Sequence, residues 1–332
     1  MAEDLGVALI GTGFFGEWHA RAIAAVPGLR LVGVCDENPA AAGRLAAAYG
    51  ARVLYDWRQL IADRQSEVVV IATPHHLHAA MAIAATEAGK PTLLEKPMAA
   101  TTAECMAILE AAERGGAPLM IGHLLHFALP SLIARDRLEA GELGRPITGM
   151  STLVKLWMEP NRRAWHLEPG CGGGMLMTAG IHALDLIVWF MGAPVATVFA
   201  AAGALMHAQA ADDSAFVLLR FADGRFAQVS SVGYRDGAGS YGMDLVCETG
   251  TLRVDFARGV SIGRGGNWTA LAHSAEPDWM LRALEREWQA MLAAVRTGAP
   301  VPVPGAYARH IIACIEAALQ SSRERREVRV AP

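Results

Sequence analysis

Short apolar runs alternate with helix-compatible segments through the first third of the chain. The run Val68-Val69-Val70-Ile71 is apolar at every position, which is typical of a parallel strand covered on both faces. We predict strands at residues 7–10, 29–34, 52–55, 67–72, 92–94 and 119–122. We predict helices at residues 17–26, 39–49, 57–61, 78–88 and 102–114. This alternation predicts a doubly wound parallel sheet whose ligand lies at the carboxyl ends of the strands.

The pattern changes near residue 123. A helix is predicted at 129–139, and β-rich segments without regular intervening helices follow at 147–156, 195–201, 216–221, 225–232, 243–248 and 251–256. Asp223-Gly224 and Thr249-Gly250 separate pairs of these segments and are typical of hairpin turns. Further helices are predicted at 176–191, 279–297 and 307–322, and an edge strand follows the arginine-rich last helix. We therefore predict two domains, a Rossmann domain (1–123) and an α+β domain (124–332) with an open, mainly antiparallel sheet.

Composition narrows the class of protein. The 332 residues are 53% hydrophobic with a formal net charge of −4. The sequence lacks the long basic stripe that would indicate binding to nucleic acid. The apolar run 175–191 contains His182 and Asp185, which favours a buried helix over a membrane span. The five cysteines include no C-x-x-C pair, and the first strand begins close to Met1. These features predict reduced thiols, no signal peptide and a cytoplasmic protein.

The segment Gly11-Thr12-Gly13-Phe14-Phe15-Gly16 lies between a predicted strand and a predicted helix, and Asp36 follows twenty residues later. Gly11 permits a tight turn, Gly13 lets a pyrophosphate approach the backbone, and Gly16 lets the helix pack closely on the strand. The free N–H groups of the helix then meet the phosphates. The alternative is a structural strand–helix turn without a ligand. The complete context favours a dinucleotide site.

The choice between dinucleotides depends on Asp36. Its carboxylate is expected to accept hydrogen bonds from the adenosine ribose hydroxyls and to repel a 2′-phosphate. The following residues, Glu37 and Asn38, supply no arginine for such a phosphate. NAD is therefore predicted in preference to NADP.

Two other places carry candidate chemistry. Lys96 follows a buried strand and therefore lies at the predicted ligand crevice. Farther along, Gly172-Gly173-Gly174 precedes Thr178, His182 and Asp185, whose spacing places them on one helical stripe. The glycines permit close approach of a ligand or of another backbone segment. The alternatives are a salt bridge from Lys96 to Glu95 and a hydrogen-bonded core histidine at 182.

The sequence resembles the glucose-fructose oxidoreductase/inositol dehydrogenase/rhizopine catabolism (Gfo/Idh/MocA) family over nearly its whole length. The motifs that carry this resemblance are the glycine loop, Asp36, Thr73-Pro74 with His78, Glu95-Lys96-Pro97, Leu143-Gly144 and Gly173-Gly174 through His182 to Asp185. The resemblance implies a Rossmann domain followed by an α+β domain whose sheet forms a homodimer or homotetramer. It also implies that Lys96 binds the reacting hydroxyl and the nicotinamide, and that His182 is the acid/base.

Further site residues follow from the same resemblance. Thr73, Pro74, His78 and Glu95 are expected near the cofactor. Arg163, Trp165 and His166 belong to a polar and aromatic loop that either lines the substrate pocket or lies at the surface. No metal is expected at His75, His76 and His78, because no carboxylate or cysteine lies nearby in sequence and hydride transfer requires none.

The sequence departs from the family pattern at two positions. Thr178 occupies the position four residues before the histidine where the family has an aspartate, and His126 stands where many members have an arginine. A threonine hydroxyl forms hydrogen bonds but carries no charge. The leading hypothesis is NAD-dependent oxidation of a small-molecule sugar, cyclitol or related cyclic polyol. The alternatives are an oxidoreductase for less polar cyclic diols and a non-catalytic dinucleotide-sensing regulator.

Overall fold

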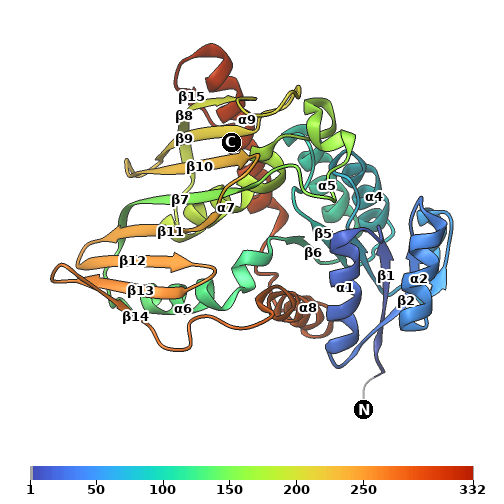
Figure 1. Cartoon of the computed structure of the whole chain (residues 1–332). Coiled ribbons are helices and arrows are strands. Elements are labelled where there is room, and N and C mark those ends of the chain that lie inside the picture. The colour runs from blue at the N-terminus through green and yellow to red at the C-terminus, as the bar shows by residue number, and fades with distance from the viewer. Residues whose placement is uncertain (1–2, 332) are drawn as a thin grey trace. The chain divides into compact units, whose positions relative to one another are not determined.

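The computed structural model describes residues 3–331, which form two compact units (Figure 1). The first unit contains the chain up to Leu124 together with Met280–Arg309, and the second contains Leu125–Trp279 and the chain from His310 onward. Residues 280–309 thus return to the first unit, although the sequence-based boundary placed everything after residue 123 in one domain.

The first unit contains a six-stranded sheet in which all paired strands are parallel, in the order β3-β2-β1-β4-β5-β6. Its strands are β1 (Leu5–Ile10), β2 (Leu29–Cys35), β3 (Arg52–Val53), β4 (Val68–Ile71), β5 (Thr92–Glu95) and β6 (Leu119–Gly122). The strand order reverses between β1 and β4, and this switch point is where a doubly wound sheet binds its ligand. The predicted doubly wound sheet is therefore confirmed.

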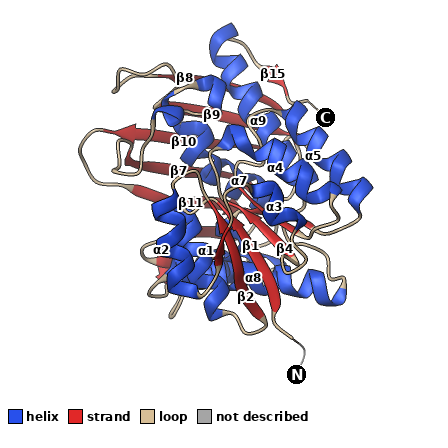
Figure 2. Cartoon of the chain, turned by 90° about the vertical axis from the view of Figure 1, so that its right-hand side faces the viewer, coloured by secondary structure: helices blue, strands red, loops and turns tan. Residues whose placement is uncertain are grey.

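Helices cover both faces of this sheet (Figure 2). They are α1 (Phe14–Ala25), α2 (Pro39–Tyr49), α3 (Trp57–Ala62), α4 (His75–Glu87), α5 (Thr102–Gly115) and α8 (Trp279–Thr297). Every residue of β4 and β5 is buried, as expected for strands covered on both sides. Asn38 caps α2, and Thr101 with Glu104 forms a capping box at α5.

The second unit is built on a nine-stranded sheet, in the order β14-β13-β12-β11-β7-β10-β9-β8-β15. Its strands are β7 (Pro146–Leu156), β8 (Val195–Gly203), β9 (Ser214–Phe221), β10 (Phe226–Tyr234), β11 (Ser240–Cys247), β12 (Gly250–Asp255), β13 (Gly259–Arg264), β14 (Asn267–Ala270) and β15 (Val328–Arg329). Only β7 and β10 pair in parallel, so the sheet is mainly antiparallel, as predicted.

The helical elements that accompany this sheet are α6 (Leu129–Glu139), α7 (Ile181–Met191), α9 (Gly305–Glu324), the 3₁₀ turns η1 (Leu124–Phe127), η2 (Ala164–Leu167) and η3 (Pro169–Cys171), and η4 (Leu176–Gly180). Element η4 is one turn of π-helix, whereas the sequence predicted an α-helix from residue 176 onward. The apolar stretch Pro169–Met191 is long enough to span a membrane, but its most apolar window is 89% buried in this fold. Its side chains are used in the core of the second unit.

Two strands, β13 and β14, were not predicted. Strand β14 is exposed at all four positions and therefore shows no alternation of buried and exposed residues. The hairpin turns at Asp223-Gly224 and Thr249-Gly250 connect antiparallel pairs, as expected.

Candidate functional site

The glycine loop joins β1 to α1, and each of its glycines has its own structural reason. Gly11 has a φ of +96°, and a Cβ there would overlap the carbonyl oxygen of Ala72. A Cβ at Gly16 would overlap the carbonyl oxygen of Gly11, whereas a Cβ at Gly13 would meet no atom within 4 Å. Gly13 is the N-cap residue of α1, and no side-chain hydrogen bond caps this helix. This loop fits the pyrophosphate of a dinucleotide.

Asp36 immediately follows β2, and its carboxylate is held by backbone N–H groups. Oδ2 accepts a hydrogen bond from Thr12 N at 2.6 Å, and Oδ1 accepts one from Asn38 N at 2.8 Å. Each carboxylate oxygen keeps a further lone pair for a ribose hydroxyl. The glycine loop and the acidic residue are thus connected before a cofactor arrives.

His78 on α4 joins the segments that follow β4 and β5. Its side chain is fully buried, with Nε2 2.8 Å from the carbonyl oxygen of Thr73 and Nδ1 2.8 Å from that of Pro97. A neutral imidazole donates to only one of these oxygens, and burial lowers the pKa of His78. The histidine therefore ties two predicted cofactor-contacting segments together as a structural bridge.

Glu95 ends β5, directly before Lys96. Glu95 Oε1 lies 2.8 Å from His19 Nε2, and Oε2 accepts a hydrogen bond from the backbone N–H of Lys96 at 3.1 Å. The Glu95 carboxylate thus fixes the peptide that carries Lys96. His19 lies on α1, three residues after Gly16.

In the second unit, the glycine run before η4 contacts protein backbone. A Cβ at Gly173 would lie 2.6 Å from the carbonyl oxygens of Trp165 and His166, and a Cβ at Gly174 would overlap Asp212. Asp212 Oδ2 also accepts a hydrogen bond from Leu176 N at 2.8 Å, and burial raises the pKa of Asp212 to about 6. Another backbone segment thus closely approaches Gly173, and the Asp212 side chain closely approaches Gly174.

Thr178 and His182 lie on η4 and α7, where Thr178 is 8% exposed and His182 is half-buried. The centroid of the His182 ring is 6.4 Å from that of Tyr241 on β11. The Tyr241 hydroxyl is buried without a hydrogen-bond partner among residues 3–331. Burial, with the nearby charge of Asp185, raises the pKa of Tyr241 well above its ordinary value, so the hydroxyl keeps its proton.

Asp185 faces His126, which stands at one of the two departures from the family pattern. His126 Nε2 lies 2.9 and 3.1 Å from the two Asp185 oxygens, and both side chains are buried. The His126 ring stacks on Trp189 at 3.9 Å. A buried histidine–aspartate pair thus links η1 to α7, the helix that carries His182.

The loop expected to line the pocket or to lie at the surface contains both buried and exposed side chains, and its contact with substrate stays a prediction. His166 is buried, its Nδ1 accepts a hydrogen bond from Arg163 N at 3.0 Å, and its ring stacks on Trp165 at 3.6 Å. The Arg163 side chain is exposed and donates to the carbonyl oxygens of Pro160 and Arg162. The close contact with Gly173 brings this loop to the start of the segment that carries Thr178.

Two family models match the chain. One, described as an oxidoreductase family with an NAD-binding Rossmann fold, matches residues 5–123, and the other, the GFO/IDH/MocA C-terminal domain, matches residues 132–253. The chain belongs to the GFO/IDH/MocA oxidoreductase family. The cofactor of this family's Rossmann domain is NAD, which agrees with the prediction from Asp36.

Individual relatives of the GFO/IDH/MocA chain extend this result. An inositol 2-dehydrogenase of Saccharopolyspora erythraea is 34% identical over 203 residues, which cover 60% of this chain and 57% of that protein. A levoglucosan dehydrogenase of Pseudarthrobacter phenanthrenivorans is also 34% identical over 203 residues, which cover 57% of this chain and 52% of that protein. The matches thus span little more than half the length of these two relatives.

A similar solved structure covers the whole chain. GenD2 from gentamicin A biosynthesis, in complex with NAD, is 26% identical with a TM-score of 0.89, covering 100% of this chain and 98% of GenD2.

Potential metal-ligating side chains meet at one place in the described part of this GFO/IDH/MocA chain. Among residues 3–331, the only set of three or more histidine, cysteine or carboxylate side chains close enough to share an ion is His19, Glu95 and Glu287. The triple at His75, His76 and His78 does not form such a set within that range. The buried set contains two residues, His19 and Glu287, that the sequence analysis did not single out.

The site residues that the sequence did not indicate differ in the strength of their sequence signal. His19 follows the glycine motif at a fixed spacing and could have been noticed. Glu287 is in an ordinary helical segment, and Tyr241 in an ordinary strand. Only the tertiary fold reveals that the Glu287 side chain and the Tyr241 hydroxyl are buried beside site residues.

Proposed function

We propose that this chain is an NAD-dependent dehydrogenase that oxidises a secondary alcohol of a cyclic polyol such as a sugar or cyclitol. The observation that carries this proposal is the pairing, in one chain, of a glycine loop fitted to NAD with a helix that presents His182 beside the buried Tyr241 hydroxyl. Relatives named inositol 2-dehydrogenase and levoglucosan dehydrogenase support the substrate class.

The residues have distinct roles in this proposal. When bound, NAD supplies a hydride acceptor at the nicotinamide. His182 accepts the hydroxyl proton of the substrate, because histidine titrates near the pH at which such transfer operates. The ammonium group of Lys96 stabilises the negative charge that develops on the alcohol oxygen. Tyr241, which keeps its proton, donates a hydrogen bond to a neighbouring hydroxyl of the polyol.

The remaining predicted contacts complete the site. Gly11, Thr12, Gly13, Phe14, Phe15 and Gly16 hold the pyrophosphate, Asp36 holds the ribose, and Thr73, Pro74, His78 and Glu95 shape the nicotinamide side. Thr178 and the loop with Trp165 and His166 contact the substrate, with Arg163 at the rim because its side chain is exposed.

The assembly and compartment are also proposed. Exposed apolar side chains gather on one face of the nine-stranded sheet, where Phe199 pairs with Leu218, and Gln228, the partner of Leu218, pairs with Met150. Such a patch is typical of a subunit interface, so we propose a homodimer or homotetramer formed through this face. All five cysteines are free, which supports a reducing, cytoplasmic location.

The experiment is a screen of cyclic polyols and cyclic diols for NADH formation. Turnover of a polyol, reduced by about 100-fold or more in Lys96→Ala and in His182→Ala with NADH binding retained, is the expected result. Turnover restricted to less polar cyclic diols would replace the substrate class. Tight NADH binding without turnover on any alcohol or carbonyl would favour the non-catalytic sensor, which Thr178 keeps open.

A further inference from the structure

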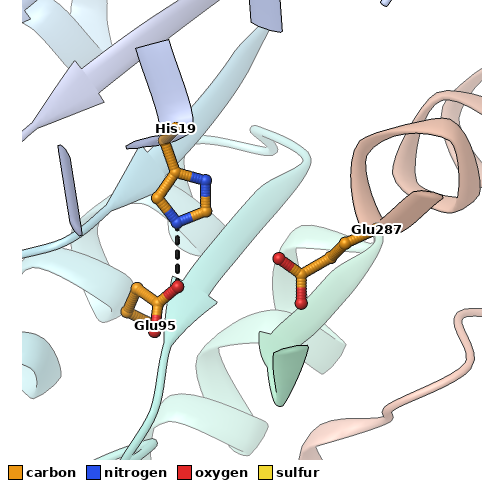
Figure 3. Close-up of side chains that lie close together, drawn as sticks. All are labelled: His19, Glu95 and Glu287. Atoms are coloured by element: carbon orange, nitrogen blue, oxygen red, sulfur yellow. Dashed lines mark hydrogen bonds and ion pairs between the residues drawn. The ribbon is translucent and has the colours of Figure 1, made fainter. Parts of the chain in front are cut away.

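Three ionisable side chains from distant parts of the sequence meet in the interior of the first unit. His19 from α1, Glu95 from β5 and Glu287 from α8 are 0%, 5% and 0% exposed (Figure 3). One ligand atom from each residue lies within 4.8 Å of the other two. A buried set of this kind can bind a metal cation or keep a proton on one of its carboxyl groups. The hydrogen bonds around the set indicate which of these two applies.

Trp288, the neighbour of Glu287, determines the tautomer of His19. The indole Nε1–H donates to His19 Nδ1 at 3.1 Å, and an indole nitrogen cannot accept. Nδ1 therefore carries no proton. The proton of the neutral imidazole is on Nε2, which donates to Glu95 Oε1 at 2.8 Å.

This tautomer argues against a metal ion. A metal bound at Nε2 would move the ring proton to Nδ1, where it would face the indole N–H. Both nitrogens of His19 are thus already committed to protein partners. The same contact opposes a doubly protonated His19, since imidazolium has no acceptor for the indole.

The two carboxyl groups have unlike surroundings. Glu95 accepts hydrogen bonds from His19 Nε2 and from the backbone N–H of Lys96, which suits an ionised carboxylate. A Cβ at Gly122 on β6 would lie 3.0 Å from Glu95 Oε1. Because glycine has no Cβ, the neighbouring strand leaves room for the Glu95 carboxylate in this position.

Glu287 has neither type of support. Both of its oxygens are buried without a hydrogen-bond partner among residues 3–331, and they face Glu95 and His19 (Figure 3). A second ionised carboxylate here would face the charge of Glu95 in a water-poor interior. Burial and that charge accordingly raise the pKa of Glu287 well above its ordinary value.

We propose that His19, Glu95, Glu287 and Trp288 form a proton-holding positioning cluster, in which neutral Glu287 and the fixed tautomer of His19 keep the Glu95 carboxylate clamped on the peptide of Lys96. The cluster acts through the peptide between Glu95 and Lys96, which the proposed function places beside the cofactor and which remains when the Lys96 side chain is removed, and so it rests on the proposed function. The other titratable groups near Glu95 are Lys96 itself and His78 on α4, whose pKa the Glu95 charge also affects. None of the cluster residues touches the reacting atoms in this proposal.

The first test measures the proton without any activity. Glu287→Gln is isosteric and permanently neutral, so it imitates the protonated acid. Because the folded pKa of Glu287 lies above its unfolded value, the wild type loses stability as pH rises from about 5 toward that folded pKa, whereas Glu287→Gln does not. The difference in melting temperature, Glu287→Gln minus wild type, should therefore increase by on the order of 2 °C per pH unit as pH rises through this range. A constant or narrowing difference would overturn the proposal.

The second test separates a proton from a cation. Zn²⁺, Mg²⁺ and EDTA are added in turn to the wild type and to Glu287→Gln, and binding is followed by calorimetry and by melting temperature. The expected result is no change in either protein. Stabilisation by one ion per chain in the wild type, lost in Glu287→Gln, would show a metal site and overturn the proposal.

The third test uses two amides that each imitate one nitrogen of His19. The amide nitrogen of Gln lies where Nε2 was and can donate to Glu95, whereas Asn reaches only the Nδ1 position. His19→Asn should weaken NADH binding by about tenfold, the factor typical of a lost hydrogen bond to a charged group, and His19→Gln should stay within about threefold of the wild type. In an active enzyme, kcat should follow the same order. Equal losses of NADH affinity in the two variants would show that His19 acts only by packing and would overturn its positioning role.

These readouts stay separate from the proposed function. The melting curves and NADH titrations need no substrate, so a wild type without polyol turnover would remove the dehydrogenase proposal and leave the cluster testable. Conversely, turnover with equal effects of the two His19 variants would remove the cluster alone.

Discussion

We predict that selectivity for NAD over NADP depends on the carboxylate charge of Asp36, which two backbone N–H groups hold in place. Asp36→Asn keeps an acceptor but removes the charge that would repel a 2′-phosphate. The ratio of the NADPH to the NADH dissociation constants should fall by about tenfold or more, because a charge pair at this range is worth on the order of 1–4 kcal/mol. Titration by fluorescence measures both constants, with Glu37→Gln as the control for a nearby exposed acid.

At the same scale, a substitution of Thr178 tests whether this residue contacts the substrate. Thr178→Asp would place a carboxylate one turn before His182 and favour its imidazolium form. Oxidation needs the neutral imidazole, so the rising limb of the pH–rate profile should move to higher pH, with preference shifting toward more hydroxylated substrates. The same variant buries a charge, since Thr178 is 8% exposed. A large drop in melting temperature with an unmoved pH profile would place Thr178 in the structural core alone.

At the scale of elements, Gly180 determines how closely η4 lies against β10. A Cβ at Gly180 would overlap Ser231 Oγ and lie 2.6 Å from Ser231 Cβ. Gly180→Ala should therefore lower the free energy of unfolding by about 1–3 kcal/mol, and the added change Ser231→Gly should restore part of it. Gly43→Ala in α2 is the matched control, because nothing lies within 4 Å of a Cβ there, and it should stabilise by about 0.5–1 kcal/mol. Chemical denaturation checks all four proteins; a harmless Gly180→Ala would contradict this packing.

The helices also show which parts of the secondary structure could be predicted from the sequence. Helices α2 and α6 have the predicted bounds because each carries a sharp local signal, a proline in the first turn and a glycine after the end. The π-turn at η4 carries no local sequence signal that was recognised, and the residues that contact it, Ser231 beside Gly180 and Asp212 at Leu176 N, are distant in sequence. The pairing of His19 with residues of α8 was equally invisible, although the glycine loop beside it was plain.

At the scale of the molecule, the exposed sheet face predicts assembly. The face is formed by Met150, Phe199, Phe216, Leu218, Phe226 and Val246, each 44–54% exposed. The opposite face is covered, since a Cβ at Gly149, next to Met150, would lie 3.0 Å from Ile187 of α7. Leu218→Glu should shift the protein toward monomer, because a charge would be buried in an apolar interface.

Light scattering with size-exclusion chromatography measures this shift. Met106→Lys, at an exposed position on α5, is the control and should leave the assembly unchanged. A wild type that is already monomeric at micromolar concentration would contradict an interface on this face.

The return of the chain to the first unit has a consequence for synthesis. The indole of Trp288 contacts His19 across 269 residues, and Ile121 N donates to the carbonyl oxygen of Val303. A nascent polypeptide emerges from the ribosome with β1 to β6 long before α8, so this first part of the chain waits with His19 and Glu95 uncovered by α8. The first unit is started early in synthesis and is completed only when α8 has been made, so a truncated transcript that stops after β6 encodes an incomplete first unit.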